Sequence, residues 1–189
     1  MKLFCFGDSN TYGYDPRSPL GERYPAAYRW VDLLAEKLDC SVVNAGENGR
    51  EIPRWPWQWE HFCRLTEKEA PVDLVILMLG TNDLLQGNSP AAAAGRMELF
   101  LTSMALDRSG ILLVGPPPVQ RGLWVDSEAL VEASMELNRE YRVLSRRLGV
   151  RFADAGMWNI PLAFDGVHFT QEGHSVFAER LAEIINKGE

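Results

Sequence analysis

Leu3-Phe4-Cys5-Phe6-Gly7-Asp8-Ser9-Asn10 opens the chain as an apolar run that stops abruptly at small and polar residues. Such a run predicts a buried strand of a parallel sheet that leads into a tight turn. The polar groups of the turn would then stand at the carboxyl end of the strand, the edge at which open α/β sheets bind ligands. Taken alone, the stretch favours a plainer explanation, in which Asp8 and Ser9 close the turn through side-chain hydrogen bonds.

The rest of the chain alternates predicted strands with predicted helices. Further apolar strands are expected at 41–44, 73–79, 111–114 and 150–153, and helices at 28–38, 90–106, 127–148 and from 170 onward. This alternation predicts a flavodoxin-like three-layer α/β/α sandwich with a five-stranded parallel sheet in the order 2-1-3-4-5. No repeat or linker interrupts the pattern, so one domain spanning 1–189 is expected.

Two segments between these elements are rich in aromatic residues. Residues 8–24 combine Gly, Pro, Tyr and Arg and are expected to form a surface loop. In the second segment, Trp55, Trp59 and Phe62 fall on one face of a predicted helix and are expected to pack in the core. Trp57 points elsewhere on that helix, so we expect it to wall a pocket.

Composition excludes several classes of protein. With 189 residues and a formal net charge of −7, the chain can bury a core but lacks the basic surface of a nucleic-acid binder. Cys5, Cys40 and Cys63 lie in or beside apolar runs without zinc spacing, so we expect reduced core thiols and neither a metal nor another cofactor. The first apolar run is too short for a signal peptide and no later run could span a membrane, which predicts a soluble cytoplasmic protein.

The predicted loop at 154–169 carries candidate catalytic partners for Ser9. In the predicted strand order this long loop must reach back across the fourth strand, and it carries Asp165 and His168. A serine hydroxyl is a weak nucleophile unless a base takes its proton, and imidazole is the usual base near neutral pH. An aspartate bonded to the other ring nitrogen would fix the tautomer of that imidazole. These residues therefore supply the parts of an acyl-transfer site.

Such a site also needs hydrogen-bond donors for an oxyanion. The candidates are the backbone N–H groups of Ser9 and Gly46 and the side-chain amide of Asn82, which follow three neighbouring strands. Four further residues are candidates for the substrate-binding rim: Arg50, Trp57, Pro117 and Trp124. Asp8 is expected to hold the serine turn, and Asp83 to cap the turn after Asn82.

The chain resembles the SGNH (GDSL-type) hydrolase family in four blocks that span nearly its whole length: Gly7-Asp8-Ser9, Asn44-Ala45-Gly46, Gly80-Thr81-Asn82-Asp83 and Asp165-Gly166-Val167-His168. The resemblance implies that Ser9 is the nucleophile, that Asp165 and His168 complete the triad, and that Gly46 and Asn82 donate to the oxyanion. The segments around Ser9 and His168 look most like the arylesterase and acyltransferase branch. Asn10 departs from the leucine usual after the serine, and the chain is short for that branch.

The resemblance implies a serine esterase that hydrolyses short-chain acyl esters through an acyl-enzyme, with O-acetylated sugars among its candidate substrates. A lysophospholipase or thioesterase is the alternative within the family. The sequence leaves open whether the chain forms a homo-oligomer. From another class, a flavin- or carbohydrate-binding module would have the same flavodoxin-like fold. A flavin protein leaves Asn82, Asp165 and His168 unexplained, and the absence of a Walker A motif argues against phosphoryl transfer.

Overall fold

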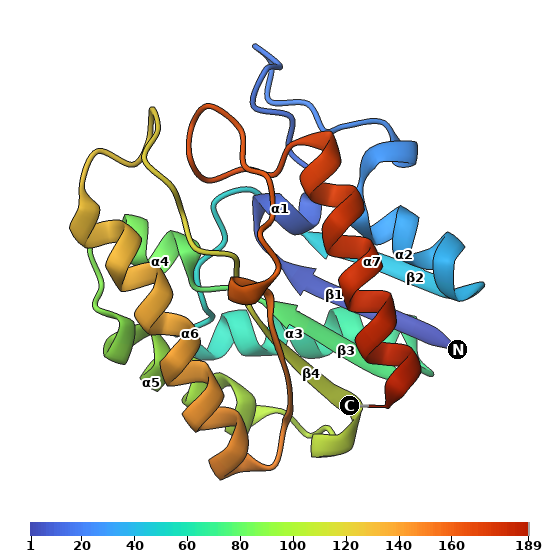
Figure 1. Ribbon diagram of the computed structural model, residues 1–189. Coiled ribbons are helices and arrows are strands. Elements are labelled where there is room, and N and C mark those ends of the chain that lie inside the picture. The colour runs from blue at the N-terminus through green and yellow to red at the C-terminus, as the bar shows by residue number, and fades with distance from the viewer. Residues whose placement is uncertain (189) are drawn as a thin grey trace.

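A parallel sheet of five strands forms the centre of the computed structural model, which describes residues 1–188 (Figure 1). The strands are β1 (Lys2–Gly7), β2 (Ser41–Gly46), β3 (Leu74–Met78), β4 (Ile111–Gly115) and β5 (Arg151–Asp154), and their order is β2-β1-β3-β4-β5. The predicted fold class and strand order are therefore confirmed. Gly7 at the end of β1 pairs with Gly46 on one side and Met78 on the other, so three neighbouring strands end level at the same edge.

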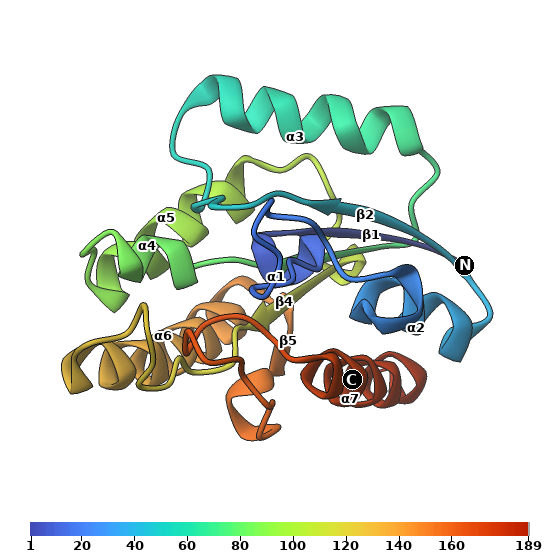
Figure 2. The same cartoon turned by 90° about the horizontal axis from the view of Figure 1, so that it is seen from above.

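Helices cover both faces of this sheet (Figure 2). The longer ones are α2 (Trp30–Leu38), α3 (Pro56–Glu69), α5 (Pro90–Ser103), α6 (Glu128–Leu148) and α7 (Gln171–Lys187), and two short ones are α1 (Ser9–Tyr12) and α4 (Thr81–Leu85). Single 3₁₀ turns lie at Ala26–Tyr28, Arg108–Gly110 and Ala155–Met157. The core residues of α2 and α7 pack on one face of the sheet, and those of α3, α5 and α6 on the other. Among residues 1–188, no helix is both long and apolar enough to cross a membrane.

Alternating residues of β1 anchor the two halves of the core. Phe4 and Phe6 belong to the cluster with α3, while Leu3 and Cys5 belong to the cluster with α2 and α7. Phe62 of α3 meets the Phe6 ring edge to face, with ring centroids 5.0 Å apart. Because β1 is buried on both faces beyond Lys2, residues 3–6 are all apolar and do not alternate with polar residues, which is why this run indicates the fold.

Two local expectations are wrong. Residues 8–24 do not begin as loop but as the single helical turn α1, because Asp8 caps the backbone of this turn. Trp55 is 55% exposed rather than packed in the core, since it precedes α3 as its N-cap and the helical spacing does not apply to it. Phe62 is buried and Trp59 is packed against the core, as expected for residues inside the helix.

Candidate active site

Ser9 is the first residue of α1, directly beyond the carboxyl end of β1. The Asp8 carboxylate accepts a hydrogen bond from the Asn10 N–H at 3.0 Å, and this confirms that Asp8 holds the serine turn. A side chain at Gly7 would place its Cβ 2.1 Å from Thr11 Oγ1 and 2.8 Å from Met78 O, so only glycine permits the chain to fold back so tightly. Burial raises the pKa of Asp8 to about 6, against the opposing effect of the Asn10 N–H.

The loop after β5 brings His168 and Asp165 to Ser9. His168 Nε2 lies 2.9 Å from Ser9 Oγ, and His168 Nδ1 lies 2.7 Å from Asp165 Oδ2. The other carboxylate oxygen of Asp165 accepts the N–H groups of Val167 and His168 at 2.9 and 3.0 Å. All three side chains of this hydrogen-bonded chain belong to buried residues. The structure thus places the three residues in the order that proton transfer from a serine hydroxyl requires.

Asp165 is held in its charged form by these contacts. Burial acts to raise its pKa, but the hydrogen bonds from His168 and from the two backbone N–H groups outweigh burial and leave the pKa below its usual value. An ionised carboxylate can only accept a hydrogen bond, so the N–H of the imidazole lies at His168 Nδ1, and the Nε2 lone pair faces the hydroxyl of Ser9. The arrangement therefore favours the tautomer in which His168 can act as a base.

The other two histidines of the chain occupy different environments. His174 accepts from the Trp30 N–H at 3.3 Å in the core, and burial lowers its pKa to about 3, which keeps it neutral. His61 is an exposed residue on α3. His174 is thus a core residue and His61 a surface residue.

Two aromatic rings from separate loops flank the His168 imidazole. The Tyr14 ring lies with its centroid 4.5 Å away, and the Trp124 ring meets the imidazole edge to face at 4.9 Å. The Trp124 N–H also donates to the Asp165 carbonyl at 3.0 Å, so backbone and side chain of Trp124 both contact this site. Trp124 was a predicted rim residue, whereas Tyr14 was not; the aromatic composition of 8–24 was its only signal in the sequence.

The expected oxyanion donors differ in their surroundings. The Asn82 amide donates one of its two N–H groups to the Arg50 carbonyl at 3.0 Å and has a second to offer. The Gly46 N–H, in contrast, donates to Asn44 Oδ1 at 2.9 Å. A Cβ at Gly46 would lie 2.1 Å from the Tyr12 nitrogen, so this glycine allows α1 to pack directly on β2. The N–H of Gly46 is thus already engaged in the structure.

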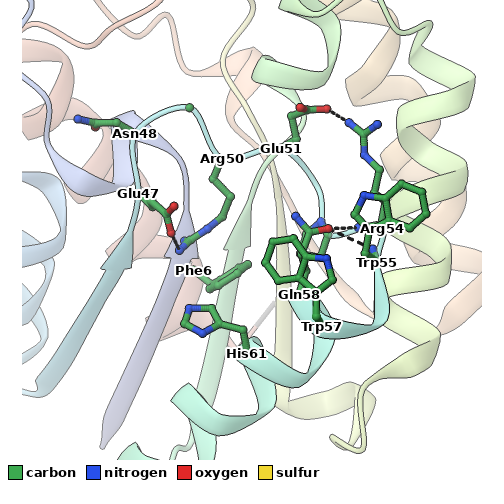
Figure 3. A pocket seen from close by; sticks show the side chains of 12 residues that line it. Phe6, Glu47, Asn48, Arg50, Glu51, Arg54, Trp55, Trp57, Gln58 and His61 are labelled. Atoms are coloured by element: carbon green, nitrogen blue, oxygen red, sulfur yellow. Dashed lines mark hydrogen bonds and ion pairs between the residues drawn. The ribbon is translucent and has the colours of Figure 1, made fainter.

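The four predicted rim residues lie in three places. Arg50 and Trp57 line a cavity of about 420 Å³ between the loop after β2 and α3, with Phe6 at its base (Figure 3). Ser9 and His168 are not among the described residues that line it. Pro117 lines another cavity, of about 210 Å³, and Trp124 contacts His168. The sequence alone could not separate these positions, because all of them follow strands at the same edge.

Arg50 connects the larger cavity with the serine turn. Its guanidinium lies 4.1 Å above the Phe6 ring, and its Nη1 donates to the Gly7 carbonyl at 2.8 Å and to the Ala45 carbonyl. Its own carbonyl receives the Asn82 amide. One residue therefore contacts the ends of β1 and β2 and the side chain of Asn82.

Several solved structures share this architecture. The aryl esterase of M. smegmatis is 29% identical with a TM-score of 0.86, and a putative arylesterase from Agrobacterium tumefaciens str. C58 is 29% identical with a TM-score of 0.85. Est24, a carbohydrate acetylesterase from Sinorhizobium meliloti, is 25% identical with a TM-score of 0.84. Each match covers 98% of this chain and 98% of the other, so the expectation that the chain is short for the arylesterase branch is wrong.

Comparison with sequences identifies the family of the chain. A search of curated protein sequences gave no match. The family model of the GDSL-like lipases and acylhydrolases, however, matches residues 5–176, a range that includes Ser9, Asn82, Asp165 and His168. The chain therefore belongs to the GDSL-like lipase/acylhydrolase family, and it is a carboxylic ester hydrolase.

Proposed function

We propose that this enzyme hydrolyses short-chain acyl esters, with O-acetylated sugars among its substrates, through an acyl-enzyme on Ser9. The observation that carries the proposal is the hydrogen-bonded chain from Ser9 Oγ through the His168 imidazole to the Asp165 carboxylate. The likeness to an aryl esterase and to a carbohydrate acetylesterase over 98% of the chain supports it.

In the first half of the reaction, Ser9 Oγ attacks the ester carbonyl while its proton passes to His168 Nε2. The tetrahedral intermediate collapses as the bond to the alcohol oxygen breaks, and His168 returns the proton to the leaving alcohol. In the second half, a water attacks the acyl-enzyme carbonyl and gives one proton to His168 Nε2. The bond to Ser9 Oγ then breaks, His168 returns the proton to Ser9 Oγ, and the acid leaves. Asp165 stays ionised throughout and stabilises the imidazolium.

The oxyanion requires donors at the same edge. We assign the N–H of Ser9 and the free N–H of the Asn82 amide to this task. Gly46 could donate only if its N–H left Asn44 Oδ1, so we propose Gly49 as the backbone donor in its place. Gly49 has a φ of +75° and open space where a side chain would stand, and the neighbouring carbonyl of Arg50 already contacts Asn82.

The experiment compares Ser9→Ala and His168→Ala with Ser175→Ala, which changes an exposed serine on α7. We expect a fluorophosphonate probe to label Ser9 in the wild type and in Ser175→Ala. The first two variants should lose turnover of p-nitrophenyl acetate, and Asn82→Ala should lose about 10²-fold in kcat. Undiminished turnover in Ser9→Ala or His168→Ala would refute the mechanism.

The cavity beside Arg50 is the proposed site for the alcohol part of a sugar ester. Trp57 is 63% exposed and offers an indole face on which a sugar ring can stack, and the charged residues Arg50, Glu51 and Arg54 line the same cavity (Figure 3). We expect Trp57→Ala to raise KM for acetylated sugars and to leave KM for p-nitrophenyl acetate unchanged. Equal effects on the two substrates would contradict this assignment.

A second candidate, an acyl hydrolase for longer chains of the lysophospholipase or thioesterase type, is favoured by an apolar rim near His168. Leu123, Trp124 and Phe164 are 71%, 49% and 59% exposed, and the Leu123 N–H donates to the Phe164 carbonyl. A series of p-nitrophenyl esters from acetyl to palmitoyl separates the candidates. Highest kcat/KM with acetyl supports the first, and a rise with chain length supports the second.

We also propose that the enzyme acts in the cytoplasm. Cys5, Cys40 and Cys63 are all free thiols in the structure, and unpaired cysteines of this kind persist in reducing compartments. Fractionation of the source cells with an antibody against the protein tests the location.

A further inference from the structure

Asn10 joins the nucleophile's turn to the loop that carries His168. Its side-chain Nδ2 donates to the Val167 carbonyl at 3.1 Å, and its Oδ1 accepts from the Phe169 N–H at 2.9 Å. Val167 and Phe169 are the residues on either side of His168. One carboxamide, next to Ser9 in the chain, therefore holds the backbone on both sides of the base.

The pair of contacts selects the chemistry of this side chain. A carbonyl can only accept and an N–H can only donate, so the side chain between them must offer one donor and one acceptor. Asparagine offers both at the right separation, whereas leucine offers neither and aspartate, when ionised, offers two acceptors. Asn10 is 6% exposed, so water does not readily replace a lost contact.

The backbone of Asn10 is anchored as firmly as its side chain. Its N–H donates to the Asp8 carboxylate at 3.0 Å, and its carbonyl accepts from the Trp30 indole at 2.9 Å. On the facing loop, the His168 carbonyl accepts from the Ala163 N–H at 2.7 Å. The contacts of Asn10 are thus part of a connected network that fixes where the imidazole can stand.

We propose that Asn10 is a positioning residue, which sets the distance of 2.9 Å between Ser9 Oγ and His168 Nε2 by fixing the backbone around His168. The inference rests on the proposed roles of Ser9 and His168. Because Asn10 touches neither the hydroxyl nor the imidazole in this network, it acts through the loop and not on the substrate.

The first test compares Asn10→Leu with Leu181→Ala, a core truncation on α7. Both variants lose stability, but only Asn10→Leu releases the loop of His168. We expect kcat and the rate of fluorophosphonate labelling of Ser9 to fall about 100-fold in Asn10→Leu, the cost of displacing a reacting group by about 1 Å, with KM little changed. In Leu181→Ala, kcat should stay within about threefold of wild type at a temperature where both variants are folded. A kcat near wild type in Asn10→Leu would overturn the proposal.

The second test uses Asn10→Asp, which preserves the shape of the side chain and keeps the test informative if Asn10→Leu does not fold. A protonated carboxyl donates to the Val167 carbonyl and accepts from the Phe169 N–H, as the amide does, whereas the ionised form repels the carbonyl. We therefore expect the ratio of kcat/KM in Asn10→Asp to that in wild type to rise towards one as the pH falls from about 8 to about 5, the range in which a buried carboxyl titrates. A ratio that does not change with pH would refute the positioning role of Asn10.

Dividing kcat/KM of Asn10→Asp by that of the wild type cancels the effect of groups that titrate in both proteins. The groups that face this position in each of them are Asp8 in the same turn, Asp165 and His168 on the loop, and Tyr24 and His174 beside Phe169. Ser9→Ala, measured alongside, separates the two proposals. If Ser9→Ala retains activity, the proposed function is refuted. If Ser9→Ala is inactive and Asn10→Leu is fully active, only the positioning role of Asn10 is refuted.

Discussion

The Trp124 indole stands edge-on to the His168 imidazole, with an interplanar angle of 82° and 4.9 Å between ring centroids. The same residue donates its backbone N–H to the Asp165 carbonyl. The loop after β4 therefore covers two members of the hydrogen-bonded chain at once. This contact makes Trp124 a boundary between the buried imidazole and the solvent, because its own side chain is half exposed.

Replacing Trp124 should affect catalysis more than folding. We expect Trp124→Ala to lower kcat/KM for p-nitrophenyl acetate about tenfold, since loss of an apolar contact costs roughly 1.4 kcal/mol in the transition state. Trp124→Phe should retain most of the activity, because a ring still meets the imidazole. Val143→Ala, which changes an exposed apolar residue of α6, is the control, and wild-type kinetics in Trp124→Ala would contradict the assignment.

The buried carboxylate of Asp8 makes stability depend on pH. Burial raises its pKa to about 6 in the folded protein, while the unfolded chain has the ordinary value near 4. The folded state then binds the proton more tightly, so the contribution of Asp8 to the free energy of unfolding falls as the pH rises through this window. At about 1.4 kcal/mol per pKa unit, the penalty above pH 6 amounts to about 3 kcal/mol.

Asp8→Asn should remove this penalty, because the amide oxygen still accepts the Asn10 N–H. We expect the variant to be more stable than wild type at about pH 8 and equal to it at about pH 4. Urea unfolding at several pH values measures the difference. A gap that does not change with pH would mean that Asp8 is not the group responsible.

The fold could be predicted from the sequence because its signal is local and repeated. Every strand is an apolar run that ends in small or polar residues, and such runs separated by amphipathic helices allow few topologies. Trp55 shows the limit of this reasoning. A helical face predicts burial only inside the helix, and the boundary of α3 at Pro56 leaves Trp55 outside it.

The site could be predicted in part for a related reason. Ser9, Asn82 and His168 follow different strands, and a parallel sheet places the ends of those strands at one edge. The donors of individual hydrogen bonds could not be predicted, since they depend on side-chain directions. The Asn44 oxygen occupies the N–H of Gly46, and Asn10 contacts Val167 across 157 positions of sequence. Neither contact produces a periodic pattern in the sequence from which it could be predicted.

Gly122 tests how closely the two loops around the site are packed. A Cβ at this position would lie 2.6 Å from the Asp165 carbonyl carbon and 2.6 Å from the Gly166 nitrogen. Both are backbone atoms that cannot swing aside, so Gly122→Ala should displace the Asp165 turn and lower kcat about 10²-fold. In Gly95→Ala, where no atom outside the adjoining residues and backbone of α5 lies within 4 Å of the added Cβ, we expect normal kinetics and a gain in stability of about 1 kcal/mol. Normal kinetics in both variants would show that the loops are free to separate.

The side chain of Asp83 stabilises the turn that carries Asn82. Its fully buried carboxylate accepts the Ile52 N–H at 2.9 Å and Arg96 Nη1 at 2.8 Å, and so ties the loop after β2 to α4 and α5. Asp83→Ala leaves the buried Ile52 N–H without its acceptor, while Arg96 keeps Glu51 at 3.7 Å, so the variant should lose about 1–3 kcal/mol in urea unfolding.

Asp83→Asn should cost less, because its oxygen still accepts the Ile52 N–H, but it loses the charge that faces Arg96. Asp107→Ala, at an exposed position, should stay within about 0.5 kcal/mol of wild type. If Asp83 fixes the loop through Ile52, kcat falls further in Asp83→Ala than in Asp83→Asn at a temperature where both are folded. Equal kcat in the two variants would show that the ion pair with Arg96, and not the bond to Ile52, holds Asn82 in place.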